Sequence, residues 1–119
     1  MNKKIKEIVL IESNFKMDLS KLSEEILKKG AGVTQQMSIT VNKGEKTKVI
    51  KIIVNIKGVL DKVEFLEVHL IYLAELYENE EMNRDKSSEI VKEIYPKIKE
   101  QIENFYRNSP QSTLKAPVF

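Results

Sequence analysis

The chain has 119 residues, of which 41% are hydrophobic and 32% charged, and its formal net charge is +2. At about 100–200 residues per domain, this length predicts a single domain over residues 1–119. The apolar content is too high for an intrinsically disordered chain. No apolar stretch approaches the roughly 18 uninterrupted residues of a membrane-spanning helix, and no signal peptide is recognisable at the start. We therefore expect a cytoplasmic protein without membrane insertion.

The first half of the chain predicts strands. Residues 5–15 are rich in β-branched side chains and indicate a first strand. Residues 19–29 carry leucine and isoleucine at helical spacing before Gly30, which indicates a short crossover helix or an ordered loop. Residues 33–57 alternate apolar and polar side chains on both sides of a turn signal at 42–44, and this pattern predicts a β-hairpin.

Residues 62–78 carry conflicting signals. Leu66, Leu70 and Leu73 have helical spacing, and the abundance of Leu, Ala and Glu favours a helix. A turn near Gly58 and Asp61 would instead return the chain antiparallel to the preceding strand. The glutamates of 62–78 would then face the lysines of 46–57 across the pair. We predict a strand on this second ground.

Residues 85–107 predict a long amphipathic helix, because isoleucine recurs every fourth residue from Ile90 to Ile102. Pro96 lies inside this pattern and predicts a kink or a restart near Tyr95. Residues 108–119 form an extended, proline-punctuated tail. The order of elements predicts an α+β fold, in which a four-stranded antiparallel sheet carries one long C-terminal helix packed on it.

The residues that could carry chemistry are few. His69 is the only histidine, and a catalytic dyad would have to pair it with Glu67 or Glu75 without any nucleophile motif. The acidic residues between Glu75 and Asp85 match no calcium loop. Cysteine is absent, which excludes thiolate metal sites, disulfides and cysteine nucleophiles. We expect neither an enzyme nor a bound metal or cofactor.

The charge is divided unevenly along the chain. Residues 1–62 carry 13 lysines and 7 acidic residues, a net charge of +6, whereas residues 63–119 have a net charge of −4. The basic stripe at 43–57 is accompanied by only two arginines in the whole chain and by no tryptophan, so a solvated strand face is favoured over a nucleic-acid site. The two halves are complementary in charge.

The predicted elements carry more apolar surface than one helix covers. Tyr95, Phe105 and Tyr106 border the isoleucine stripe, and the predicted sheet has apolar residues on both faces. Part of this surface should be buried in an oligomer or held open for an apolar partner. This surplus is the main physical indication of function.

Several motifs, in this order, resemble the SecB-type protein-export chaperones. The segment 94–99, Ile-Tyr-Pro-Lys-Ile-Lys, resembles the aliphatic, aromatic and proline segment that opens the main helix of that family. The segment 114–119, Leu-Lys-Ala-Pro-Val-Phe, is similar to the tail that follows, and residues 60–68 and 11–16 resemble the turn into the last strand and the first strand. Residues 1–119 contain no counterpart of the second helix or of the acidic or metal-binding tail of many members, so we expect a short, divergent member, and residues 71–74 replace a glycine-containing centre.

The resemblance implies an ATP-independent chaperone, a holdase, that binds unfolded or nascent polypeptides, with a role in protein export as one possibility. It also implies a homo-oligomer, either a dimer or a tetramer. On the chemistry of their side chains, and not on motif positions, we expect the client contacts to be Phe15, Met17, Met37, Phe65, Tyr72 and Phe119. Pairing of a client with a sheet edge is a further expected aid.

Two other functions remain open on the sequence. The first is a SecB-like interaction protein dedicated to one partner, such as an antitoxin-associated chaperone or a phage-encoded host-binding protein. A broad client range would contradict it. The second is a nucleic-acid-binding module, which predicts affinity that falls steeply with salt.

Overall fold

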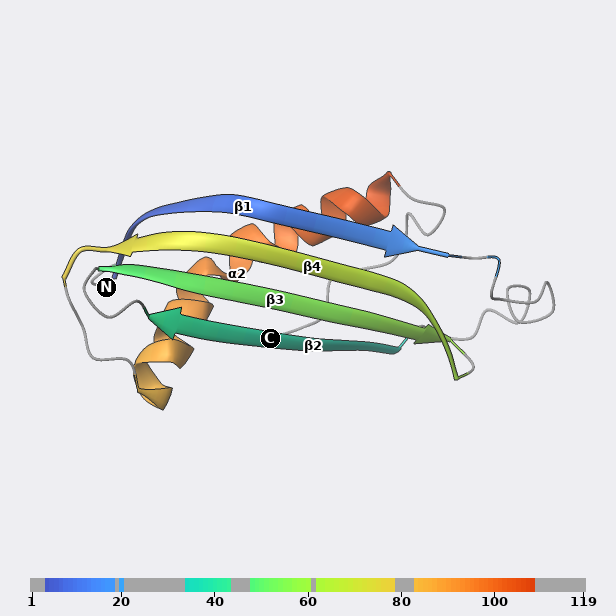
Figure 1. Cartoon of the computed structure of the whole chain (residues 1–119), viewed down its shortest axis with the longest axis horizontal. Coiled ribbons are helices and arrows are strands. Elements are labelled where there is room, and N and C mark those ends of the chain that lie inside the picture. Colours follow the sequence, from blue (N-terminus) through green and yellow to red (C-terminus); the bar gives the residue numbers. More distant parts are fainter. Residues whose placement is uncertain are drawn as a thin grey trace.

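The computed structural model describes residues 4–18, 20, 34–43, 48–60, 62–78 and 83–108. Its elements are the strands β1 (Ile5–Met17), β2 (Thr34–Lys43), β3 (Val49–Leu60) and β4 (Val63–Leu76), and the helix α2 (Arg84–Arg107). The strands form one antiparallel sheet in the order β1-β4-β3-β2, and α2 lies across one of its faces (Figure 1). The expected α+β fold is confirmed. The predicted tail and nearly all of the predicted helix at 19–29 lie outside the described residues.

β4 occupies a central place in the sheet, between β1 and β3. Its alternate residues from Leu66 to Leu76 are all buried, and every one of them is at most 4% exposed. This burial on a strand outweighs the helical preference of the local sequence, because packing regularly overrides intrinsic propensity. Lys57 of β3 stands directly opposite Glu67 of β4, as the strand prediction required.

A β-bulge shapes the start of β4. Gly58 pairs with Leu66 and Val59 pairs with Glu64, so Phe65 is an extra residue in β4. The carbonyl oxygen of Phe65 accepts a hydrogen bond from the backbone N–H of Asp18, 2.8 Å away, and so ties the end of β1 to the bulge. Lys62, in the turn before β4, has a φ of 65°, a left-handed conformation that is uncommon outside glycine.

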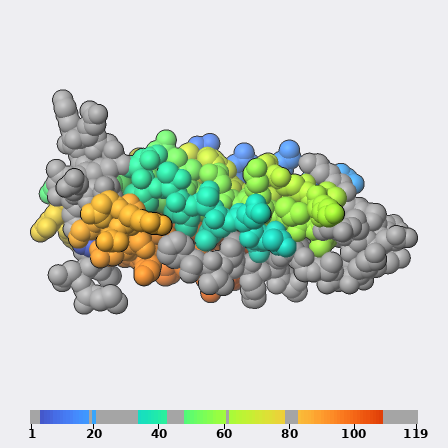
Figure 2. Space-filling model, turned by 90° about the horizontal axis from the view of Figure 1, so that it is seen from below, coloured from blue at the N-terminus to red at the C-terminus, as the bar shows by residue number. Residues whose placement is uncertain are grey.

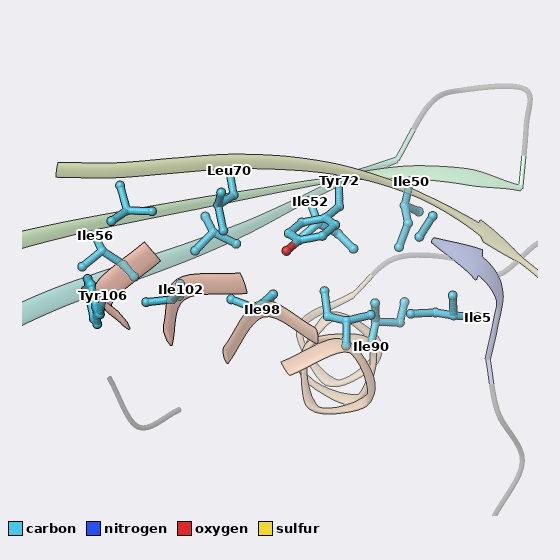
Figure 3. Packing of buried hydrophobic residues seen from close by; sticks show 14 of the residues in the cluster. Ile5, Ile50, Ile52, Ile56, Leu70, Tyr72, Ile90, Ile98, Ile102 and Tyr106 are labelled. Atoms are coloured by element: carbon cyan, nitrogen blue, oxygen red, sulfur yellow. The ribbon is translucent and has the colours of Figure 1, made fainter. Parts of the chain in front are cut away.

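The core lies between the sheet and the isoleucine stripe of α2 (Figure 3). The Asn83 side chain caps the helix by accepting from the backbone N–H of Lys86. The helix runs through Pro96 without a restart, although the proline has no backbone N–H to donate to the preceding turn, and Figure 1 shows the helix bending midway along its length. The helix buries the predicted isoleucine stripe together with Val91 and Tyr106 beside it; its buried residues are Ile90, Val91, Ile94, Ile98, Ile102 and Tyr106.

The helix also fixes the beginning of β1. The two carboxylate oxygens of Glu93 accept hydrogen bonds from the backbone N–H groups of Lys4 and Ile5, each at 2.9 Å. Ion pairing of Lys4 with Glu89 adds a weaker contact at 3.6 Å. Among the described residues, no helix has the length and apolar character that a membrane crossing requires.

Candidate functional site

One row of side chains crosses all four strands on the face that carries α2. Phe15 of β1 pairs with Val68, Val68 pairs with Ile56, and Ile56 pairs with Met37 of β2. Val68 and Ile56, in the middle, are buried, whereas Phe15 and Met37, at the two edges, are only half-buried. In the adjacent row, Met17 lies at the β1 edge and is also half-buried.

The last turn of α2 lies between the two ends of this row. The Phe105 ring stacks on the Phe15 ring, with centroids 4.9 Å apart, and the Tyr106 ring lies 6.1 Å from the same phenyl ring. The hydroxyl of Tyr106 donates a hydrogen bond to Oε1 of Gln35 on β2, 2.5 Å away. Tyr106 thus contacts both β1 and β2 at the end of the helix. Burial of its side chain raises the pKa of the Tyr106 hydroxyl well above the usual range.

We call the half-buried side chains around this helix end the aromatic–methionine surface, and it comprises Phe15, Met17, Met37 and Phe105. Each packs on the core with one side and retains exposed area on the other. Methionine is flexible and polarisable, so it adapts to side chains of different shapes. The arrangement suits apolar contact with chains of varied sequence.

The other predicted contacts lie elsewhere. Phe65 and Tyr72 belong to the core and are only 3% and 4% exposed. Burial raises the pKa of Tyr72 to about 12, and its ring lies on the helix side of the sheet (Figure 3). Phe119 lies outside the described residues. Client contact by these three residues remains a prediction. Of the predicted residues that the structure describes, Phe15, Met17 and Met37 retain exposed area. Phe105 joins the aromatic–methionine surface although it was not among the expected contacts.

The opposite face of the sheet carries an apolar stripe that the expected contacts did not include. Val9 and Ile11 of β1 are 48% and 50% exposed, Leu73 of β4 is 37% exposed, and Ile71 beside it is 8% exposed. Val9 pairs directly with Leu73. We call these four residues the outer stripe. The alternation of β1, which places valine and isoleucine on the face away from the helix, was the sequence signal for it.

His69 lies on the same outer face, in a shallow polar depression. Its Nδ1 is 2.6 Å from Oδ1 of Asn55, directly across the strand pair. A depression of about 250 Å³ is lined there by Asn14, Lys16, Asn55, Glu67, Val68 and His69. The hydrogen-bond partner of His69 is therefore an amide and not either of the glutamates considered for a dyad. Within the described ranges, no group of three or more metal-binding side chains comes together.

The fold is similar to that of a solved chaperone. A structure of the SecB-like chaperone of Mycobacterium tuberculosis, in complex with a peptide from the HigA1 antitoxin, matches with a TM-score of 0.59. The match covers 98% of this chain and 90% of that one at 9% sequence identity. A protein of unknown function from Streptococcus agalactiae matches with a TM-score of 0.37 at 13% identity, over 95% of this chain and 96% of that one. No protein-family model and no curated protein matches the sequence. The likeness shows that the fold is SecB-like.

Proposed function

We propose that this protein is a SecB-like chaperone, which binds unfolded or nascent polypeptides without ATP. The observation that carries the proposal is the aromatic–methionine surface, located on a SecB-like fold at the end of the helix. Half-exposed Phe15, Met17 and Met37 offer apolar contact, and the described residues bring together no catalytic dyad or metal-binding group. A non-enzymatic role is part of this proposal.

The mechanism is apolar burial. A client side chain that covers exposed apolar area gains about 25 cal/mol per Å² removed from water. Several weak contacts of this kind favour unfolded segments, which expose contiguous apolar side chains, over folded proteins, which bury them. Two contacts hold this surface in place. The Phe105 ring stacks on the Phe15 ring, and the hydroxyl of Tyr106 donates a hydrogen bond to Gln35.

A paired substitution tests the surface. In Met17→Gln/Met37→Gln, two thioethers are replaced by amides of similar length, so client affinity should fall at least about fivefold, given the loss of apolar burial. Thr40→Gln is the matched control, because Thr40 is exposed on the opposite face of the same strand. Affinity is measured by fluorescence anisotropy with reduced, carboxymethylated α-lactalbumin, a permanently unfolded chain. Equal affinity of the double variant and the wild type, with both folded by circular dichroism, would contradict the assignment of the surface.

A second candidate function is service to one dedicated partner. It is favoured by the similar M. tuberculosis structure, in which the SecB-like chaperone holds an antitoxin peptide. The two functions differ in range: a holdase binds several unrelated unfolded chains with similar affinity, whereas a dedicated chaperone binds one partner far more tightly than all others. A panel of unrelated unfolded proteins, measured in parallel with a pull-down from host lysate, separates them. Delivery of clients to an export pathway belongs to the holdase proposal.

Assembly into a dimer or tetramer is part of the same proposal. The outer stripe exposes Val9, Ile11 and Leu73 together on one face, and contiguous apolar patches on soluble proteins mark interaction surfaces. Sedimentation equilibrium of the wild type should give a mass of two or four chains. Ile11→Ser should shift that equilibrium toward the monomer if the outer stripe is the contact, whereas Thr40→Ser on the same face should not.

A further inference from the structure

The exposed apolar residues gather on the face of the sheet that lies away from α2. Val9 and Ile11 of β1, Val49 of β3 and Leu73 of β4 are each at least 37% exposed, and with Tyr77 they are the exposed large hydrophobic residues of the described part of the chain. α2 passes behind the strands in Figure 1, and Figure 2 shows the strands and the helix as two layers with the strands uppermost. An apolar patch of this kind marks an interaction surface.

Charges of both signs flank these apolar residues. Glu7 and Glu75 lie side by side toward one end of the sheet, and Glu75 also pairs with Lys6 at 3.9 Å. Lys57 and Glu67 lie side by side toward the other end. A strongly basic or strongly acidic partner does not match this mixture, because it would meet like charges as well as unlike ones. A second copy of the chain carries the same mixture, so its fit depends on how the two faces are oriented.

Symmetry limits these orientations. In a two-fold dimer both copies use the same patch, and the strands of two packed sheets run nearly parallel or antiparallel. An axis along the strands, between β1 and β4, would place Glu7 against Glu75 of the partner subunit, a like-charge contact that occurs twice. The same axis moved to the centre of the sheet would place Val9 against Asn42 of the partner subunit, on the polar strand β2. Both arrangements are unfavourable.

An axis across the strands gives a better match, because each strand then lies antiparallel on its own copy. With the axis midway between Ile71 and Leu73, these two residues face each other across the dimer, and Glu75 faces His69 of the partner subunit. Centring the axis on Ile71 instead would place Glu75 against Glu67 of the partner subunit. The order of residues along β4 therefore selects both the direction of the axis and its position.

β1 fits the same arrangement, because it pairs with β4 residue by residue. Val9 lies over the bulge at Ile11 of the partner subunit, and Glu7 lies over Asn14 of the partner subunit. The apolar residues of both strands thus meet at the centre of the contact. Between Glu7 and Asn14, no two like charges of β1 face each other directly.

The overlap is sufficient for a reversible dimer. About ten residues along each central strand overlap, or about 33 Å, and four strands are about 19 Å wide. The two faces together then bury about 1,200 Å², which is the lower limit for stable protein interfaces. We therefore expect a dimer that dissociates on dilution.

We propose that two copies of this chain stack outer face to outer face with antiparallel strands, so that the outer stripe lies at the centre and Glu75 of each copy faces His69 of the other. This inference rests on the assembly named in the proposed function and adds its contact surface and geometry. α2 and the aromatic–methionine surface lie on the other face of each sheet. The dimer therefore presents two client surfaces that point away from each other.

Cysteine cross-linking tests the orientation, because the chain has no native cysteine. The single variants His69→Cys and Glu75→Cys are mixed in equal amounts and oxidised mildly, and the disulfide dimers are quantified by mass spectrometry. The mixed dimer should be at least about fivefold more abundant than either homodimer, against about twofold for random pairing, because a disulfide forms only between facing positions. His69→Cys mixed with Asn14→Cys is the matched control, since these positions face each other only if the axis runs along the strands.

A charge exchange tests the contact itself, with dimer dissociation measured by sedimentation equilibrium. His69→Glu places a carboxylate against Glu75 of the partner subunit, so the dissociation constant should rise at least about tenfold at low salt. The double variant His69→Glu/Glu75→Lys restores an unlike pair and should return to within about threefold of the wild type. Ser38→Glu is the matched control, because Ser38 is exposed in the same cross-strand row at the β2 edge, and it should change dissociation by less than about twofold.

The outcomes separate this inference from the proposed function. If the protein is an oligomer but the mixed disulfide is no more abundant than random pairing gives, or forms with Asn14→Cys instead, the stacked geometry is overturned and assembly stands. If the folded protein is a monomer and Ile11→Ser weakens binding of unfolded α-lactalbumin, the outer stripe is a client surface and the dimer is overturned. If it is a monomer and Ile11→Ser has no effect on clients, assembly and this inference both fail, while client binding is decided by Met17→Gln/Met37→Gln.

Discussion

Gly58 on β3 lies so close to Leu66 on β4 that a Cβ atom on the glycine would stand 2.8 Å from the Cβ of Leu66 and 2.7 Å from its Cδ2. Both residues are buried, and they meet beside the bulge at Phe65. The glycine is therefore required by close approach and not by an unusual backbone angle. Met17, at the end of β1, pairs with Leu66 and so lies in the same row as this contact.

Gly58→Ala should lower the free energy of unfolding by about 1–3 kcal/mol, because the added methyl group overpacks the pair. Urea denaturation measures the change. Leu66→Ala removes Cδ2 and Cγ, two of the three Leu66 atoms that the added methyl group would meet, and leaves Cβ in place. The double variant Gly58→Ala/Leu66→Ala should therefore be less destabilised than the sum of the two single variants. Simple additivity would show that the outer atoms of the Leu66 side chain are not the obstacle.

Glu93→Ala should destabilise the fold by about 1–3 kcal/mol. The substitution leaves the backbone N–H groups of Lys4 and Ile5 without the carboxylate that accepts from both. Glu100 is exposed on the same helix, and Glu100→Ala should change stability by less than about 0.5 kcal/mol. Equal effects of the two substitutions would indicate that the carboxylate does not hold β1.

The two buried tyrosines should respond differently to loss of the hydroxyl group. Tyr106→Phe removes the bond to Gln35 and should cost about 1 kcal/mol. The hydroxyl of Tyr72 is buried without a hydrogen-bond partner among the described residues, so Tyr72→Phe should leave stability unchanged or increase it. Thermal denaturation at pH 7 compares them, and a larger loss for Tyr72→Phe than for Tyr106→Phe would contradict this assignment.

Stability should fall as the pH rises above 10. Burial raises the pKa of Tyr72 from 10.0 to about 12, so the unfolded chain loses its proton first and ionisation favours unfolding. The protonated tyrosine contributes its full stabilisation of the folded state below pH 10. Between pH 10 and about 12, the free energy of unfolding falls by about 1.4 kcal/mol per pH unit for each such tyrosine. Denaturation curves between pH 9 and 12 should show a smaller slope for Tyr72→Phe. An identical slope would mean that Tyr72 does not titrate as a buried group.

Much of the fold could be predicted because periodic burial leaves a direct trace in the sequence. The isoleucines spaced from Ile90 to Ile102 form the buried stripe of α2, and the alternating segment 33–57 forms β2 and β3. β4 required long-range reasoning, since the spacing of Leu66, Leu70 and Leu73 fits a helix. Residues 63–76 form a strand because they pair with β1 on one side and with β3 on the other.

The functional surface was less predictable, because exposure depends on which strands lie at the edges. Phe15, Met17 and Met37 were expected and lie half-exposed around the helix end, whereas Phe65 and Tyr72 have similar side chains but face the core. The bulge that buries both Phe65 and Leu66 has no local sequence signature beyond Gly58. The strand order β1-β4-β3-β2, which makes β2 an edge, arises from pairing across the whole chain.

The most direct test of the central claim is suppression of aggregation. A chemically unfolded, unrelated enzyme is diluted into buffer without ATP, with the protein present at sub-stoichiometric to excess ratios, and light scattering is recorded. Suppression that saturates near a small oligomer per client, and that is weakened in Met17→Gln/Met37→Gln but not in Thr40→Gln, is the predicted result. Unchanged aggregation at excess protein, from a sample shown to be folded, would contradict a general holdase.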